Sequence, residues 1–150
     1  MKKGLLKSAL DRIAQEVPEL RWIDTDEGQL DFADSRPPVA FPCCLADLTL
    51  PDCDNMANNG PLIQIIRVRL TLKVAFNDCA SFNTKTPVSV REKAFSRLDV
   101  LQSIHKALQA WRTENCMKSF RRLSVTTQPR PDGLKAYACV YEATYIDQPE

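Results

Sequence analysis

One long segment of alternating apolar residues, at positions 61–76, constrains the fold of this chain more than any other feature. Every second residue from Leu62 to Phe76 is apolar, with Gln64 as the one polar exception. Side chains alternate between the two faces of a β-strand, so a period of two predicts a long strand with one buried face. The opposite face starts apolar and then becomes polar and basic; its residues are Ile63, Ile65, Arg67, Arg69, Thr71 and Lys73.

The neighbouring segments predict two β-hairpins. Residues 39–50 alternate in the same way, with Pro42 expected at a sheet edge or a bulge because proline has no backbone donor. A loop at 51–60, rich in Asn, Asp and Gly, would join them to the long strand. Residues 120–128 and 134–146 form the second hairpin around the turn sequence PRPDG. The last segment is moderately apolar on both sets of positions, so we expect it to be covered on both faces.

Two further segments have the period of amphipathic helices. The first spans residues 3–17 and should end at Pro18. The second runs from a capping box, Ser89 with Glu92, to about Glu114. Its apolar stripe consists of Ala94, Phe95, Leu98, Leu101, Ile104, Leu108 and Trp111, and its charged residues, including Arg97, are expected off that stripe.

The order helix, hairpin, helix, hairpin predicts an α+β fold. We expect a two-layer sandwich: a mostly antiparallel sheet built from two β-hairpins, with two helices packed against it. The even-numbered face of 61–76 should lie under the second helix, and a short strand is expected around 21–24. With 150 residues, positions 1–150 suit a single domain that buries roughly 70% of its unfolded surface.

Composition and charge narrow the location and the partners. A net charge of +1 argues against a global attraction to nucleic acid or to an anionic membrane. Asp11, Arg12 and Glu16 interrupt any apolar core of a signal peptide. No apolar run approaches the roughly 20 residues that span a bilayer. We therefore expect a cytoplasmic protein that does not bind membranes or nucleic acid directly.

No catalytic, cofactor-binding or metal-binding motif is recognisable, which predicts a protein that is not an enzyme and needs no cofactor. The single histidine, His105, lies beside the apolar stripe of a helix, where a structural role is expected. Adjacent Cys43 and Cys44 would point to opposite faces of a strand, and no Cys-x₂₋₄-Cys pair exists, which favours packed thiols over a zinc site. The sequence DCDN at 52–55 has calcium-loop spacing without the required glycine and glutamate.

Basic residues cluster weakly on the long strand and in KSFRR, which contains Arg121 and Arg122. Two interpretations remain open: an ordinary solvated face, or a surface that meets an acidic partner or nucleic acid. The acidic segment 24–34 could be that partner, within this chain or in a neighbouring copy. Opposed acidic and basic patches on one chain suit head-to-tail ring assembly.

Four stretches carry a resemblance to a known family: RPPVAFPCCLADL at 36–48, IQIIRVRLTLKVAF at 63–76, RLDVLQSIHKALQAW at 97–111 and YACVYEATYID at 137–147. Together they resemble the tail-terminator, or tail-completion, proteins of long-tailed phages and prophages. The resemblance implies an α/β sandwich and a hexameric ring that caps the tail tube and docks the head–neck connector. It also implies a structural protein without enzymatic activity, cytoplasmic during assembly and part of the virion afterwards.

Three functions follow in order of preference. The first is a ring-forming tail terminator or neck component whose partners are itself, the tail tube and the connector. The second is a cytosolic α+β module that binds a small ligand or peptide, and the third is an enzyme whose residues lie too far apart in sequence to recognise. For the first, the candidate assembly surface consists of Ile63, Ile65, Arg67, Arg69, Lys73, Arg121 and Arg122.

Overall fold

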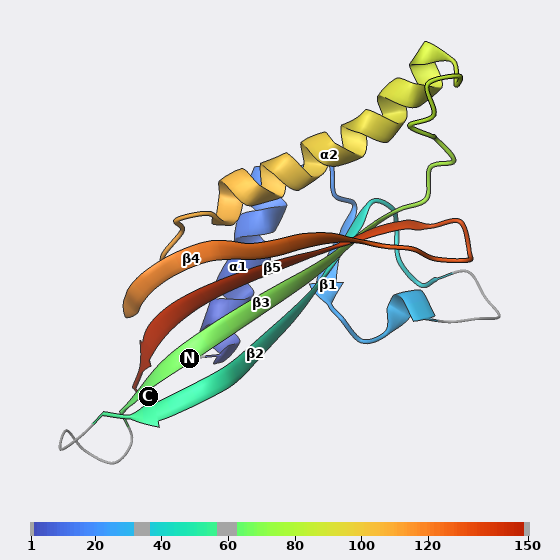
Figure 1. Ribbon diagram of the computed structural model, residues 1–150. Coiled ribbons are helices and arrows are strands. Elements are labelled where there is room, and N and C mark those ends of the chain that lie inside the picture. The colour runs from blue at the N-terminus through green and yellow to red at the C-terminus, as the bar shows by residue number, and fades with distance from the viewer. Residues whose placement is uncertain (1, 32–36, 57–62, 149–150) are drawn as a thin grey trace.

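The structure is a two-layer α+β sandwich, as the sequence predicts (Figure 1). A computed structural model describes residues 2–31, 37–56 and 63–148. The elements, in chain order, are α1 (Lys2–Glu16), β1 (Trp22–Thr25), the 3₁₀ turn η1 (Gln29–Asp31), β2 (Cys43–Asn55), β3 (Gln64–Phe76), α2 (Val88–Leu108), β4 (Cys116–Gln128) and β5 (Lys135–Asp147). Within these described ranges, neither helix has the length and apolar character that crossing a bilayer requires.

The sheet has five strands in the order β1-β2-β3-β5-β4. The two predicted hairpins, β2–β3 and β4–β5, join through an antiparallel pairing of β3 with β5 over their whole length. The short strand β1 adds a fifth member, parallel to the first four residues of β2. The long predicted strand therefore lies at the centre of the sheet, where both of its edges are hydrogen-bonded.

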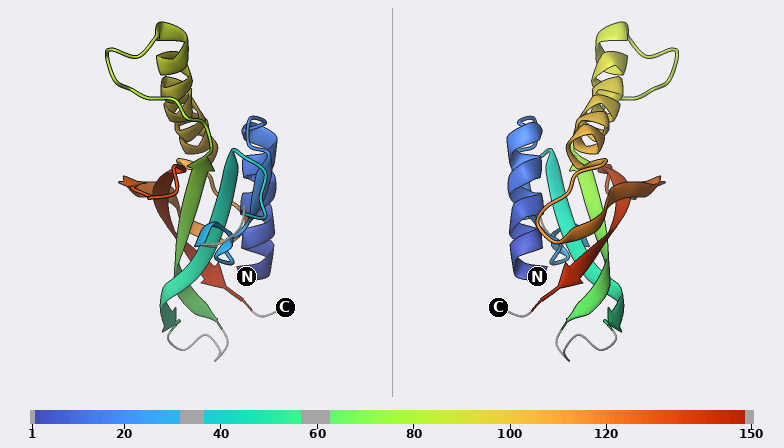
Figure 2. Two further views of the ribbon diagram at one scale, coloured as in Figure 1. Left: turned by 90° about the vertical axis from the view of Figure 1, so that its right-hand side faces the viewer. Right: turned by 90° about the vertical axis from the view of Figure 1, so that its left-hand side faces the viewer.

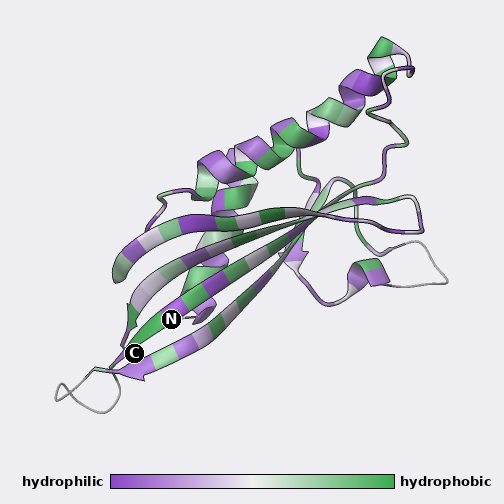
Figure 3. Cartoon of the chain, in the orientation of Figure 1, coloured by the Kyte–Doolittle hydropathy of each residue, from purple (hydrophilic) through white to green (hydrophobic). Residues whose placement is uncertain are grey.

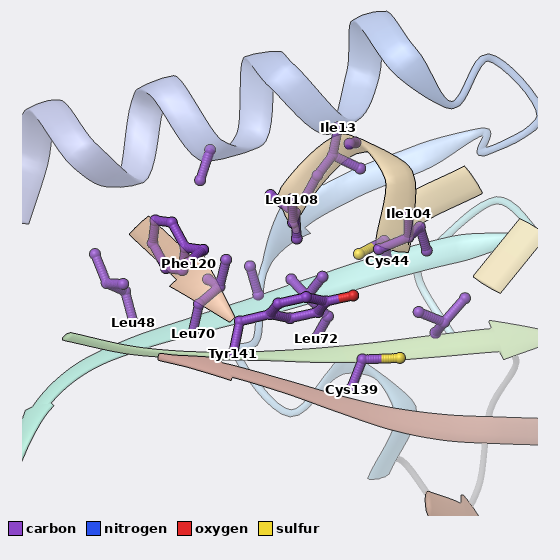
Figure 4. Close-up of a cluster of buried hydrophobic side chains, with 14 of the residues drawn as sticks. Ile13, Cys44, Leu48, Leu70, Leu72, Ile104, Leu108, Phe120, Cys139 and Tyr141 are labelled. Carbon is purple, nitrogen blue, oxygen red and sulfur yellow. The ribbon is translucent and has the colours of Figure 1, made fainter. Parts of the chain in front are cut away.

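Both helices cover the same face of the sheet. The even-numbered side chains of β3, from Ile66 to Phe76, are buried in one cluster with residues of α1 and α2, which confirms the predicted buried face. Figure 4 shows Ile13 of α1 and Ile104 and Leu108 of α2 against side chains that rise from the strands. Each fully buried leucine or isoleucine contributes about 1.5–3 kcal/mol. Leu62, expected on the same face, lies outside the described residues.

The predicted boundary of the first hairpin is wrong at both ends. Strand β2 begins after Pro42 and continues to Asn55, through the first half of the expected loop. A register shift between Thr49 and Asp52 leaves Leu50 and Pro51 without partners on β3. The bulge accommodates the proline, so pairing resumes beyond it. Val39 and Phe41, expected within the strand, instead lie before it and pack on the cluster that contains Cys43.

The predicted ends of α2 are also wrong. The helix begins at Val88 with Pro87 as its N-cap, and no side chain caps it, so the expected capping box does not form. It ends at Leu108, because Ala110 adopts a positive φ of 63° that breaks the helical path. Trp111 lies beyond the helix and stacks on Phe120 of β4, with ring centroids 5.7 Å apart. Trp111 therefore contributes to packing without belonging to the helical stripe.

Two of the seven residues in the predicted apolar stripe of α2 do not face the core. The N-terminal half of the helix rises away from the sheet (Figure 1), and Phe95 and Leu98 are 41% and 44% exposed. Arg97, expected to face solvent, is instead only 2% exposed. The inward face of α2 consists of Ala94, Arg97, Val100, Ile104, Ala107 and Leu108.

Strand β5 is covered on both faces only near its start. On the helix side its tyrosines and Cys139 are buried, as expected. On the other side Ala136 is buried in a second, smaller cluster with Leu30 and Leu45. From Val140 onward, that side is only half-buried, and no described element covers the sheet there.

Candidate assembly surface

The face of the sheet opposite α1 and α2 is called the open face here. Seen from the side in Figure 2, α1 lies along one face of the sheet only, and Figure 3 shows polar and apolar residues alternating along the strands. The strand register places these residues on the open face: Asp47, Thr49, Asp52, Asp54, Ile65, Arg67, Arg69, Thr71, Lys73, Lys118, Arg121, Ser124, Val140, Glu142, Thr144 and Ile146. Of the seven predicted surface residues, five belong to this set, and a sixth, Ile63, lies directly before β3.

The arginines at the centre of the open face are paired within the chain. Glu142, whose side chain is 16% exposed, lies between Arg67 and Arg69: its Oε1 is 3.2 Å from Nε of Arg67 and its Oε2 is 3.2 Å from Nη2 of Arg69. Oδ2 of Asp52 is 3.9 Å from Nη1 of Arg67. Nε of Arg69 is buried and has no hydrogen-bond partner among the described residues. The basic row predicted from the sequence is thus largely neutralised by its own sheet.

The acidic segment 24–34 contacts the same chain wherever it is described. Asp26 lies 3.6 Å from Nζ of Lys73, and Arg130 pairs with Asp31 at 3.8 Å and donates to the carbonyl of Leu30. From the sequence, the acidic segment could contact basic residues either within this chain or in a neighbouring copy. For Lys73, the contact within the chain is observed. Residues 32–34 lie outside the described part of the chain. This segment and the second cluster cover one end of the open face.

The opposite end of the open face is apolar. Ile65 pairs with Ile146 across β3 and β5, and both side chains are half-buried, as is Ile63. Asp54 on β2 is the neighbour of Ile65 on the other side. The open face therefore grades from a covered end, through a paired charged centre, to an apolar end flanked by an acidic strand.

Arg121 and Arg122 do not lie together. Arg121 is opposite Glu142 and faces the open side, whereas Arg122 is opposite Tyr141 and faces the helices. Adjacent strand residues alternate, and bulges on both sides of this pair decide which of the two points outward. Arg122 therefore does not belong to the predicted surface, and Arg121 does.

His105 contacts the core tyrosine instead of the open face. Its Nδ1 is 3.1 Å from the hydroxyl of Tyr141. Burial, and then the nearby positive charge of Arg122, lower the pKa of His105. Burial raises the pKa of Tyr141 to about 12, so this hydroxyl stays protonated at neutral pH. The pair satisfies two polar groups beside the core, which is consistent with the structural role expected for this histidine.

The cysteines occupy separate environments. Cys43 and Cys44 are buried on opposite faces of β2, in different clusters, as strand alternation predicts. Burial raises the pKa of Cys43 to about 11 and that of Cys44 further. Within the described ranges, no group of three or more His, Cys, Asp or Glu side chains is placed to hold a metal ion.

Sequence reasoning missed one polar cluster and two clefts. Arg97 donates to both carboxylate oxygens of Asp78 and, at 2.7 Å, to the carbonyl of Ala80. Its guanidinium lies 5.4 Å from the ring centroid of Phe82. Hydrogen bonds from Arg97 lower the pKa of Asp78, and the pair fastens loop 77–87 to α2. The one available signal was that position 97 falls on the helical face of Ala94 and Ile104.

Clefts of about 480 Å³ and 470 Å³ open beside the two ends of this cluster. The first is bordered by α2 and the end of β3, including Phe76, Lys93, Ser96 and Asp99. The second lies between loop 77–87 and the turn that joins β4 to β5, and includes Arg97 and Arg130. Both volumes are within the range of small-molecule sites.

The fold and the surface thus define a class: an α+β sandwich with one helix-covered face and one open face of mixed apolar and charged character. No family model matches this chain, and no curated protein is significantly similar to it in sequence.

Proposed function

We propose that this protein is a structural component of a phage or prophage tail. In this proposal it is a tail terminator or neck protein that assembles into a ring, caps the tail tube and docks the head connector. The resemblance of four stretches to such proteins supports the family, and these stretches overlap β2, β3, α2 and β5.

The observation that carries the proposal is the apolar end of the open face. Half-buried isoleucines lie next to two arginines that are already paired with Glu142 and, for Arg67, also with Asp52. A partner that covers this surface would gain about 25 cal/mol for each Å² of apolar area it buries. It would not have to supply carboxylates for the two arginines. Such a surface suits protein–protein contact more than the binding of a charged small molecule.

Replacing Ile65 by aspartate tests the proposal. We expect Ile65→Asp to abolish ring formation or binding to the tail-tube end, because a buried unpaired carboxylate is costly at an interface. The matched control is Leu98→Asp, the same change at an exposed apolar residue of α2 outside the open face. Light scattering and negative-stain microscopy measure assembly, alone and with the tail-tube protein encoded nearby. Circular dichroism confirms that each variant is folded.

An Ile65→Asp variant that is folded and assembles like wild type would refute the role of this surface. A wild-type protein that forms no ring, alone or on the tail tube, would refute the proposed function itself. The neighbouring genes give an independent test, because capsid, portal or tail-tube genes beside this one are expected.

The cleft beside α2 favours a second candidate, a small-ligand-binding module. Its lining combines Phe76 and Val100 with the charged side chains of Lys93 and Asp99. Ser96→Trp would fill this cleft from an exposed position. A ligand found by thermal-shift screening that binds wild type and not Ser96→Trp would support this candidate over the first.

A further inference from the structure

The sheet has two lateral edges that no described strand covers. Strand β1 pairs only with the first four residues of β2, so residues 47–55, called the β2 edge, have no described strand on their outer side. On the far side of the sheet, β4 is the last strand. Residues 109–111 bond to its outer side at Phe120, which leaves residues 123–128, called the β4 edge. Uncovered edges present unpaired N–H and C=O groups, which are templates for pairing with another strand.

The two edges have matching directions. Each neighbouring pair from β2 to β4 is antiparallel, so β2 and β4 run in opposite directions along the sheet. If the β4 edge of one copy lies beside the β2 edge of the next, with the helices of both copies on the same side, the new pair is antiparallel. The same geometry can repeat from copy to copy, since it joins two different surfaces.

The two sides of the sheet carry opposite charge on the same face. Lys118 and Arg121 lie on the open face of β4, whereas Asp47, Asp52 and Asp54 lie on the open face of β2. The register connects Lys118 through Thr144 and Arg67 to Asp52. Lys118 is therefore level with Asp52, whereas the β4 edge is level with residues 43–48 of β2, most of which β1 covers. Pairing of the two uncovered edges therefore needs a neighbour displaced along the strands; a copy that sets Gln128 opposite Asp47 brings Arg121 near Asp54. Lys118, Arg121, Asp47 and Asp54 form no ion pair with any described residue. Their charges are therefore available to a neighbour.

Other features keep these edges from pairing indiscriminately. Both strands contain bulges, and Pro51 removes one donor from the β2 edge. Bulges, proline and charged side chains are the devices by which sheet edges avoid aggregation. The β4 edge, by contrast, is the uncharged and wholly exposed sequence LSVTTQ. These features favour a partner strand that carries complementary charges and forms only a few backbone hydrogen bonds with the edge.

We propose that copies of this chain associate head to tail, with the β4 edge of one copy beside the β2 edge of the next. Arg121 of the first copy then lies near Asp54 of the second, and Lys118 on the same face of β4 adds positive charge to that side. This inference rests on the proposed self-assembly and adds to it the two surfaces that meet and the polarity of the ring.

Two charge-reversal variants test it. The first, Lys118→Glu with Arg121→Glu, makes both sides acidic. The second, Asp47→Lys with Asp54→Lys, makes both sides basic, and it spares Asp52, which contacts Arg67. All four residues are exposed, so both variants should fold. We expect each variant alone to associate on the order of tenfold more weakly than wild type, and less so in high salt.

Mixing the two folded variants should restore association, because the acidic β4 strand of the first variant then meets the basic β2 edge of the second. Analytical ultracentrifugation at low salt measures the association of wild type, of each variant alone and of the mixture. Distinguishable tags test whether the two variants alternate in the mixed assemblies. Two outcomes overturn the inference while the proposed function stands: wild-type-like association of either variant alone, or no recovery on mixing. Absence of association of wild type, alone and with the tail tube, overturns the proposed function instead.

Discussion

The ion pair between Arg97 and Asp78 should be a large single contributor to stability. Arg97 is almost completely buried, and Asp78 is 28% exposed. Removing one partner of a buried pair costs about 3–5 kcal/mol, because the other charge is left without compensation. Asp78 keeps some contact with water, so we expect Arg97→Met to lower the free energy of unfolding by about 3 kcal/mol. Methionine retains the apolar stem, which limits the added cavity.

Urea denaturation followed by circular dichroism measures this loss, with Lys93→Met as the control. Lys93 is exposed on the same helix, and its replacement should change stability by less than about 0.5 kcal/mol. The double variant Arg97→Met with Asp78→Asn leaves no uncompensated charge. It should therefore be more stable than the sum of the two single losses indicates, by about 2 kcal/mol.

The pair also holds loop 77–87, so its loss should have a local effect. Lys85 lies in that loop and is exposed. Trypsin should cleave there faster in Arg97→Met than in wild type, at urea concentrations where both remain folded. A loss of less than about 1 kcal/mol together with unchanged cleavage would refute the reasoning, since the guanidinium would then not link loop to helix.

Three further predictions concern acid, the core and the thiols. The pKa of Asp78 is lower in the folded state than in the unfolded chain, so its contribution is present above about pH 4 and is lost as the pH falls through the folded value. The stability difference between wild type and Asp78→Asn should therefore shrink in acid titrations, and a constant difference would contradict this. Leu72→Ala should cost about 3 kcal/mol in urea denaturation, because Leu72 is fully buried at the centre of the sheet; a loss below about 1 kcal/mol would show that the core collapses around the gap. Iodoacetamide should label the exposed Cys53 and Cys79 in the folded protein and spare Cys139, whose pKa burial raises to about 11. Mass spectrometry measures the order of labelling, and labelling of Cys139 before the other two would contradict this prediction.

The sequence was most informative where one physical requirement acted alone. Strand β3 lies under the helices on one side and at the centre of the sheet, so burial imposes a strict period of two from Ile66 to Phe76. The same logic placed Cys43 and Cys44 on opposite faces. The α+β class followed from the order of such segments.

Sequence reasoning failed where contacts between distant residues override the local signal. Pro51 reads as a loop residue, yet pairing with β3 continues past it through a bulge. Arg97 reads as a surface charge, yet Asp78, which lies 19 residues earlier, satisfies it in the interior. The helical stripe overestimated burial at Phe95 because nothing in the sequence gives the angle at which α2 leaves the sheet.

The candidate surface was predictable in membership but not in electrostatics. Periodicity alone grouped Ile65, Arg67 and Arg69 on one face. It could not show that Glu142, more than seventy residues away, forms an ion pair with both arginines. Nor could it separate Arg121 from Arg122, because β-bulges decide which of two adjacent residues points outward.

In the proposed assembly, the open face and the two lateral sides of the sheet would contribute differently to binding, because their charges are paired differently. At the centre of the open face, the charges are already paired within the chain. A protein that covers them therefore leaves no charge unpaired, and the electrostatic cost is the desolvation of the existing ion pairs. Affinity at that surface would come from apolar contact around Ile65 and Ile146. The strands at the two sides of the sheet, β4 and β2, carry unpaired charges of opposite sign, which add little affinity when exposed but discriminate strongly between partners. Salt should therefore weaken the contact between copies more than the contact of the open face with a tube or connector.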